Sequence, residues 1–252
     1  MVESAVILAA GVGARLGPGA DKPPKSLLRF GGRSLLARHL DILAARGIRR
    51  VTITTGYRRE AIEAAVAEPP AGLDVKTVYN PDFTQGSVIS LWTARDALAA
   101  GGPVLLMDAD VLYDAAMIDA LVATRHDNCF LVDRDFIPGD EPVKLCIRDG
   151  RPVEFRKKVE VPFDWCGESV GFFRLSPAGA DAILAAAQAY LRDVARLQPY
   201  EEAIRDVLLA GRPSFAWEDV TGVPWIEIDF PDDVVRAERD ILPRIDVAIR
   251  SQ

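Results

Sequence analysis

The N-terminal string LAAGVGARLGPGADKPPKSLL combines glycines with two well-spaced cations. Gly11, Gly13 and Gly17 follow a short apolar run, where a chain without side chains can bring backbone N–H groups against phosphate oxygens. Arg15 lies inside the string, and Lys25 follows a pair of prolines that stiffens its approach. The spacing predicts a loop that binds a polyphosphate.

Two other interpretations compete for these glycines. Glycines after a strand also serve simply to turn the chain, and the spacing GxGxxxG is found in dinucleotide-binding loops. A dinucleotide loop leads straight into a helix, whereas Pro18, Pro23 and Pro24 exclude a helix before about Ser34. The second strand also ends without an acidic residue that could hold a ribose. Phosphate binding is therefore favoured, with Lys22 as a solvated cation.

Two aspartates, Asp108 and Asp110, end the apolar run VLLM. Carboxylate oxygens at the end of a strand, opposite the glycine loop, suit Mg²⁺. The ion would offset the repulsion between a triphosphate and an incoming anion. The alternative is an aspartate that caps the next helix, a place that Asp114 already fills. We expect a metal site here.

The reaction suggested by these groups needs no protein nucleophile, because an anionic acceptor can attack a phosphorus atom directly. His39 and His126 lack a recognisable serine or cysteine partner, and we expect both to be incidental. Three separated cysteines without a CxxC pair indicate reduced thiols, not a disulfide framework or a zinc site.

Composition narrows the class of protein. At 252 residues, with 49% hydrophobic residues, the chain can bury the core of one α/β domain. A net charge of -7 argues against a nucleic-acid or anionic-membrane surface. No apolar run approaches a membrane span, and the N-terminus lacks the basic start of a signal peptide, so we expect a cytoplasmic protein without membrane insertion.

The elements that would position these residues alternate in type. Short apolar runs separated by amphipathic stretches indicate a parallel sheet covered by helices on both faces. Ligands of such sheets lie beyond the carboxyl ends of the strands, where the glycine loop and the aspartates fall. The predicted strands are 4–9, 50–55, 73–79 and 104–107, and the predicted helices are 34–46, 58–67 and 87–99.

After Asp133 the pattern changes. Two β-like runs flank Asp149 and Gly150, which predicts a hairpin. We expect one domain over 1–252, with a nucleotide-binding core at 1–133 and 211–252 and an acceptor lobe at 134–210. The further predicted strands are 168–175, 214–218 and 225–228, and the further helices are 177–193, 200–209 and one from about 231.

The combination LAAGxGxRL followed by PKSL resembles the N-terminal signature of the sugar-phosphate nucleotidyltransferase superfamily. The resemblance covers nearly the whole chain and implies a Rossmann-like α/β fold with a mixed, mostly parallel sheet and a small acceptor-binding lobe. It implies that Ala10, Gly11, Gly13, Arg15 and Lys25 bind the nucleotide, with Arg15, Lys25 and Asp110 as the catalytic residues.

The resemblance also implies the metal ligands. Asp110, more than Asp108, matches the family's metal-binding aspartate, and the late segment PWIEIDFPDD places a second ligand on Asp229. Glu227 lies on the same strand face and is the alternative. Asp232 and Asp233 are expected to cap the last helix.

The loop before the predicted helix 87–99 offers groups that can contact a base: Gln85, Gly86 and Ser87. Ser87 could instead be the helix N-cap. Cytidylyltransferases for small phosphorylated alcohols resemble this chain at Ser90 and Leu91, but usually carry adjacent asparagines just before them. The resemblance therefore implies CTP as the nucleotide, although this departure weakens the match.

The segment from 142 to 176 resembles the acceptor lobe of phosphocholine and aminoethylphosphonate cytidylyltransferases. Lys144, and Lys157 or Lys158, are the candidate cations for the acceptor phosphate or phosphonate, Lys144 being favoured because an unpaired ammonium in an apolar strand would be costly. The run from 156 to 158 is alternatively a solvated edge. A pocket for a cationic amine is expected from Trp165, Glu168, Tyr200 and Glu201.

The sequence thus predicts a Mg²⁺-dependent cytidylyltransferase that joins CMP to a small phosphorylated alcohol or phosphonate and releases pyrophosphate. A sugar-1-phosphate or inositol-1-phosphate nucleotidyltransferase is the enzymatic alternative. A nucleotide-sensing relative without turnover is an alternative of another class. A homodimer is compatible with the sequence, which does not fix the oligomeric state.

Overall fold

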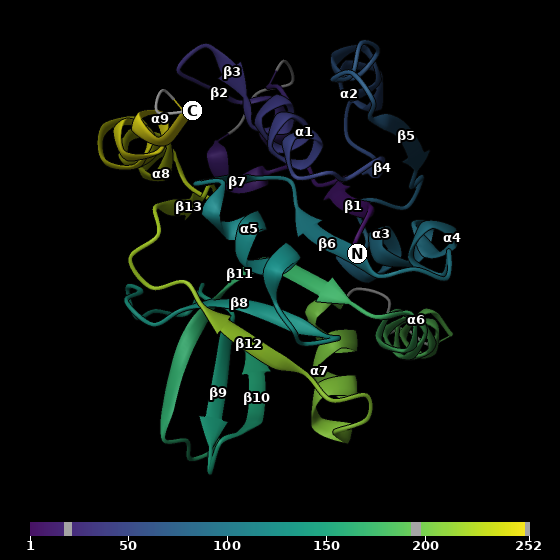
Figure 1. The fold of residues 1–252 in the computed structure, drawn as a ribbon, viewed down its shortest axis with the longest axis vertical. Helices are drawn as coiled ribbons and strands as arrows, with labels where there is room; N and C mark the ends of the chain where they lie inside the picture. Colours follow the sequence, from purple (N-terminus) through teal and green to yellow (C-terminus); the bar gives the residue numbers. More distant parts are fainter. Residues whose placement is uncertain (18–21, 193–197, 250–252) are drawn as a thin grey trace.

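The computed structural model describes residues 1–17, 22–192 and 198–249. Within them, nine strands form one mixed sheet. At its centre β1 (Ser4–Ala9) lies between β4 (Arg50–Thr55) and β6 (Val104–Asp108), parallel to both, and β5 (Asp74–Tyr79) continues the parallel part (Figure 1). The carboxyl ends of β1 and β6 are therefore neighbours, as predicted.

Helices cover both faces of the sheet, as the apolar strands predicted. The buried side chains of β1 alternate between two cores, Ala5 and Ile7 facing one and Val6 the other. The first core is closed by α1 (Leu35–Ala45) and α5 (Ala116–Ala123). Helices α3 (Ser87–Thr93), α6 (Pro177–Leu191) and α7 (Glu201–Ala210) close the second. The short α2 (Arg59–Ala65) follows β4.

The C-terminal half adds antiparallel strands to the same sheet. The predicted hairpin is present as β9 (Lys144–Arg148) and β10 (Arg151–Arg156), with Asp149 and Gly150 both at positive φ, as its two-residue turn requires. Long β11 (Trp165–Leu175) pairs with β6, β9 and β8 (Cys129–Asp133), and β12 (Ala216–Asp219) runs parallel to β8. The segment 134–210 thus extends the central sheet.

A two-stranded ribbon beside the main sheet joins distant parts of the chain. β13 (Trp225–Glu227) pairs antiparallel with β7 (Val111–Tyr113), and Ile228 N donates to Asp110 O at 3.0 Å. After it come α8 (Pro231–Arg236), a π-helical turn (Ala237–Ile241) and α9 (Leu242–Ile249). Asp233 caps α8 by accepting from Phe230 N at 2.8 Å, as expected of this acidic pair.

The structure departs from the predicted elements in several places. The single helix expected at 87–99 is two helices, α3 and α4 (Arg95–Leu98), because the Thr93 hydroxyl donates back to the Ile89 carbonyl and bends the chain there. The chain before α1, where we expected no helix, forms two 3₁₀ turns, η1 (Ala14–Leu16) and η2 (Lys25–Leu27), and a small ribbon of β2 (Arg29–Phe30) and β3 (Arg33–Ser34).

Strands β7 and β8 were not predicted. Pro18 and Asp193, which entered the proline argument and the end of the expected helix 177–193, lie outside the described residues. Among the described residues, every helix is too short or too polar to cross a bilayer.

Candidate active site

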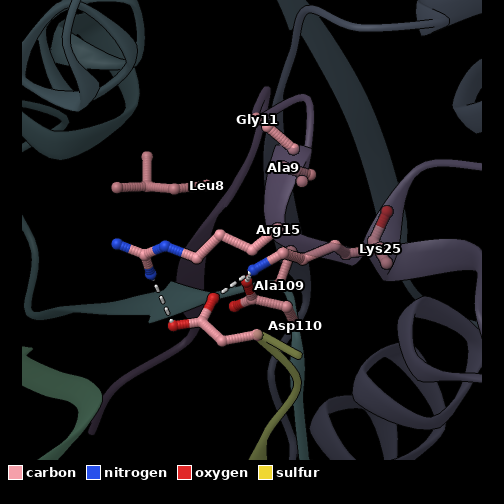
Figure 2. Close-up of a pocket in the computed structure, with 11 residues that line it drawn as sticks. Leu8, Ala9, Gly11, Arg15, Lys25, Ala109 and Asp110 are labelled. Atoms are coloured by element: carbon pink, nitrogen blue, oxygen red, sulfur yellow. Dashed lines mark hydrogen bonds and ion pairs between the residues drawn. The ribbon is translucent and has the colours of Figure 1, made fainter. Parts of the chain in front are cut away.

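A cavity of about 250 Å³ opens at the carboxyl end of β1. Gly11, Gly13 and Arg15 line it from the glycine loop, and Lys25 enters from η2. Arg15 and Lys25 both contact the carboxylate of Asp229, and Lys25 also contacts that of Asp110 (Figure 2). Gly13 has a left-handed backbone, and a Cβ atom there would lie 2.8 Å from Lys25 Cγ. The glycine thus lets this lysine pass close to the loop. Lys22, expected to be solvated, instead donates to the Gly13 carbonyl.

Three carboxylates converge below this cavity. Oxygen atoms of Asp110, Glu227 and Asp229 lie within 4.8 Å of one another, Asp110 at the β6–β7 turn and the other two from β13 and the turn after it. Hard oxygen donors at this spacing fit a divalent cation such as Mg²⁺. The structure therefore brings together both predicted metal ligands and the alternative one.

The ammonium of Lys25 lies between two of these acids. Its Nζ is 2.8 Å from Asp110 Oδ2 and 2.5 Å from Asp229 Oδ1. Burial lowers the pKa of Lys25, but the charges of the two aspartates outweigh it and raise the pKa overall. Burial also opposes ionisation of Asp229, yet Lys25 and Arg15 hold its pKa below the usual value. The pKa of Glu227 is well raised by burial and by both aspartates.

Asp108 faces a different partner. It is half-buried, and its Oδ2 accepts a hydrogen bond from the Tyr200 hydroxyl at 2.8 Å. Burial, Asp110 and Glu201 raise its pKa. Gly171, in the irregular part of β11, has a left-handed backbone and leaves room for this carboxyl, because a Cβ atom there would collide with Asp108 Oδ2. Asp108 thus ties β6 to the start of α7.

The predicted base-contacting residues share a second cavity of about 300 Å³, next to the glycine loop. Ser87 is not the N-cap of α3, which is Gly86; its hydroxyl accepts from Tyr200 N at 2.9 Å. The Gln85 amide donates to Asp82 Oδ1 at 2.9 Å. The lining residues include Ala10, Gly11, Gln85, Gly86, Ser87 and, not foreseen from the sequence, Phe83.

Phe83 is fixed by a glycine at the end of β4. A Cβ atom on Gly56 would lie 2.5 Å from Phe83 Cβ and 2.7 Å from the Ala10 carbonyl oxygen. Tyr57 N also donates to Ala10 O at 3.0 Å. The end of β4 is thereby held between the glycine loop and the base-facing loop. The only sequence signal for the role of Phe83 was the presence of an aromatic residue in the string DFTQG.

The acceptor residues predicted from the sequence separate into two groups. Lys144 does not reach the site, because its Nζ donates to the carbonyls of Gly139, Pro142 and Lys157 at 2.7, 3.2 and 2.6 Å. These bonds satisfy the ammonium that we expected to need an anion. Trp165 is also turned away: its ring packs against Trp217 and under the guanidinium of Arg134.

Glu168, Tyr200, Glu201 and Lys157 do face cavities next to the acid cluster. Glu201 and Lys157 line a small cavity of about 40 Å³, and within the described residues Glu201 Oε2 has no hydrogen-bond partner. Burial raises the pKa of Glu201 to about 7. Glu168 lines a larger cavity of about 350 Å³, and burial and the neighbouring Asp133 raise its pKa to about 7.

This larger cavity is rich in carboxylates. Beside Glu168 it is lined by Asp133, whose Oδ2 accepts from Trp225 Nε1 at 2.8 Å, and by Glu227 and Asp229 of the acid cluster. The loop 134–143, between β8 and β9, forms one wall. A residue of this loop, Glu141, contacts both Arg15 and Lys157, which no pattern in the sequence had indicated.

His39 supports the turn that carries Asp110. It is fully buried, with Nδ1 3.1 Å from the Tyr113 hydroxyl and Nε2 3.2 Å from the Ala109 carbonyl. Burial lowers its pKa to about 4, so the imidazole is neutral near pH 7. Its place is structural. The cysteines carry free thiols.

The N-terminal part of the chain matches a known family. Residues 5–160 fit the model of the MobA-like NTP transferase domain. The chain belongs to this family. The predicted membership of the nucleotidyltransferases is thereby confirmed, as is the predicted α/β fold.

Relatives of known activity extend over almost the whole chain. It is 30% identical over 240 residues to CMP-5'-(3-aminopropyl)phosphonate synthase of Streptomyces rubellomurinus. The aligned region covers 93% of this chain and 38% of that protein. It is 29% identical over 242 residues to the bifunctional IPC transferase and DIPP synthase of Aquifex aeolicus, covering 95% of this chain and 52% of the relative. The chain thus spans 38% of the length of the Streptomyces relative and 52% of the length of the Aquifex relative.

Solved structures show the same fold. The inositol-1-phosphate CTP transferase of T. maritima superposes with a TM-score of 0.76 at 18% identity, covering 97% of this chain and 96% of that one. The CTP:phosphocholine cytidylyltransferase of Streptococcus pneumoniae gives 0.68 at 19% identity, covering 94% and 98%.

Proposed function

We propose that this chain transfers CMP from CTP to a phosphonate or phosphate oxygen of a small, amine-bearing acceptor and releases pyrophosphate. The observation that carries the proposal is the convergence of Arg15 and Lys25 on the carboxylates of Asp110 and Asp229 at the edge of one cavity. Cations for a triphosphate and acids for a divalent metal meet there, as nucleotidyl transfer requires.

The reaction follows from charge and position. An acceptor oxygen forms a bond to the α-phosphorus of CTP, and the bond from that phosphorus to the β-phosphate oxygen breaks, with pyrophosphate taking the electron pair. Arg15 and Lys25 would hold the triphosphate, and the cavity with Gln85 and Gly86 suits the base. No side chain has to become a covalent intermediate.

A divalent cation completes this proposal. Asp110 and Asp229, with Glu227, would hold Mg²⁺, which offsets the negative charge of the two reacting anions. Lys25 would then exchange the two aspartates for phosphate oxygens, because the ion and the ammonium need the same carboxylates.

The acceptor's amine is inferred from the larger cavity. Several carboxylates, among them Asp133 and Glu168, line it beside the cation Arg236, and an ammonium ion would pair with them whereas a neutral polyol would not. The name of the Streptomyces relative, which joins CMP to an aminoalkylphosphonate, supports the same class of acceptor.

A matrix of substrates tests the proposal. Purified protein with Mg²⁺ is offered CTP, UTP, GTP or ATP together with 2-aminoethylphosphonate, 3-aminopropylphosphonate, phosphocholine, inositol 1-phosphate or glucose 1-phosphate, and pyrophosphate release is measured. We expect the highest kcat/KM for CTP with an aminoalkylphosphonate. Preference for UTP or GTP with glucose 1-phosphate would make the chain a sugar nucleotidyltransferase. Preference for inositol 1-phosphate would contradict the proposal that the acceptor carries an amine. If no pair of nucleotide and acceptor releases pyrophosphate although CTP binds, the chain is a nucleotide-sensing relative.

Glu168→Gln tests the amine separately from the reaction. Removing one carboxylate should raise the KM for the aminoalkylphosphonate while the KM for CTP stays unchanged, because Glu168 lines the acidic cavity and not the one beneath the glycine loop. Glu160→Gln, at an exposed position with the same change of charge, is the control. An equal effect on both acceptor and CTP would contradict the assignment.

A further inference from the structure

A carboxylate of the chain itself occupies the place between two site cations. Glu141 lies in the loop 134–143, and its Oε2 is 3.0 Å from Arg15 Nη1 and 2.9 Å from Lys157 Nζ. Arg15 comes from the glycine loop and Lys157 from the end of β10, so the two cations approach the oxygen from different parts of the fold. Both would be within reach of one bound anion.

The bridge is easily opened. The side chains of Arg15, Glu141 and Lys157 are each between 41% and 47% exposed, and ion pairs that solvent reaches this freely are held weakly. A phosphoryl group presents several charged oxygens to the same donors, where Glu141 presents one. A phosphoryl group can therefore displace the carboxylate.

The loop is anchored on both sides of Glu141. The ammonium of Lys144 donates to the carbonyls of Gly139 and Pro142, which flank Glu141 in the chain. This gives Lys144, which does not reach the site, a positioning role there: it holds the loop so that the carboxylate of Glu141 points at the two cations.

We propose that Lys157 and Arg15, whose guanidinium has enough N–H donors to contact the triphosphate as well, together bind the acceptor's phosphonate or phosphate group, and that Glu141 is a displaceable carboxylate that competes with that group for the two cations. The proposal rests on the proposed function for the identity of the acceptor. Glu141 is a positioning residue: in the empty site it keeps two cations close together, and it leaves their nitrogens when the phosphonate or phosphate group arrives.

The test is equilibrium binding without nucleotide, metal or turnover. The dissociation constants of inorganic phosphate, which is mostly a dianion at about pH 8, and of methanesulfonate, a monoanion, are measured by titration calorimetry. Glu141→Gln should tighten binding of both anions by a similar factor, about three- to tenfold, because both have to displace the same carboxylate. Glu160→Gln should change neither constant.

A second variant locates the effect. In a Lys157→Gln background, Glu141→Gln should change both constants less, because only Arg15 is left for the carboxylate to shield. Unchanged or weaker binding in Glu141→Gln, or a gain of the same size without Lys157, would overturn the proposal. Because no reaction is measured, this failure is distinct from that of the proposed function: CMP transfer with unaltered anion binding would remove only the role of Glu141.

Discussion

Lys25 is the residue that balances the charge of the site. Its ammonium contacts one oxygen of Asp110 and one of Asp229, and its side chain is only 15% exposed. Without it, carboxylates whose oxygens lie within 4.8 Å of one another would repel across a partly desolvated space. A lysine that compensates two acids and a divalent ion that could do the same are therefore alternatives for one position.

Replacing Lys25 should make this exchange visible without any reaction. In Lys25→Gln the acids lose their ammonium, so Mg²⁺ should raise the melting temperature of the variant by several degrees more than that of the unaltered protein. Differential scanning fluorimetry with and without Mg²⁺ measures the shift. Lys76→Gln, at an exposed lysine of β5 outside the site, is the control for lost positive charge. Equal shifts in all three proteins would contradict a metal site at these acids.

Asp110 should matter for turnover and not for folding. Asp110→Asn keeps the shape of the side chain but removes the charge that both Lys25 and a divalent ion would contact, so we expect pyrophosphate release to fall roughly 100-fold or more. Circular dichroism should show an unchanged fold. Asp127→Asn, an exposed aspartate away from the cavity, should keep full activity. Normal turnover in Asp110→Asn would remove the metal assignment.

Among the elements, those with strong local signals were predicted, and so was β13 as the strand 225–228, but its distant partner β7 was not. The central strands β1, β4 and β6 are apolar runs bounded by turn residues, and Asp149 and Gly150 specify their hairpin by backbone geometry alone. The ribbon of β7 and β13 is different. Each of its strands has three residues, and what stabilises them is a partner more than a hundred residues away.

The same distinction explains the site. Glycines, Arg15, Lys25 and Asp110 follow predicted strands, so their meeting could be expected from the order of the sheet. Asp229 was assigned through resemblance and not through spacing. The prediction for Lys144 rested on the premise that a buried ammonium needs a partner. Backbone carbonyls of a neighbouring loop supply such partners, and no sequence pattern reveals them.

The irregular part of β11 offers a prediction for this element. Gly171→Ala would place a methyl group against Asp108 Oδ2 and force a left-handed backbone on alanine, so we expect a lower melting temperature and loss of the Tyr200–Asp108 hydrogen bond. Gly150→Ala shares the left-handed backbone but meets no atom within 4 Å. A larger loss of stability in Gly171→Ala than in Gly150→Ala would measure the collision, and equal losses would rule it out.

At the scale of the whole molecule, negative charge is concentrated where the acceptor is expected. The net charge is -7, and Asp133, Glu168, Glu227 and Asp229 line one cavity. Partial desolvation and mutual repulsion of these groups disfavour their ionised forms, which is why the pKa values of Glu168 and Glu227 are raised. The empty protein thus gives up stability at a place that a cationic ligand would restore.

This cost should depend on pH. The pKa of Glu168 rises from its usual 4.5 to about 7 on folding, so between these values the folded state binds more protons than the unfolded state. Its contribution to the free energy of unfolding is therefore full below about pH 4.5 and is lost as the pH rises through 7. Glu168→Gln should accordingly stabilise the protein more at about pH 8 than at about pH 5.

Thermal melts at the two pH values measure this difference. Glu160→Gln is the control, because Glu160 is exposed and the change of charge is the same. A gain in melting temperature that is equal at both pH values would show that Glu168 does not titrate in this window.

The ribbon of β7 and β13 has a consequence for how the protein is made. Lys25 and Asp110 leave the ribosome long before Asp229, which arrives on a segment that docks by pairing with residues 111–113. A growing chain therefore holds the lysine with one of its two aspartate partners until Asp229 has been synthesised and β13 has paired with β7. The complete set of acids thus depends on a late docking step, whereas β1, β4 and β6 pair without it.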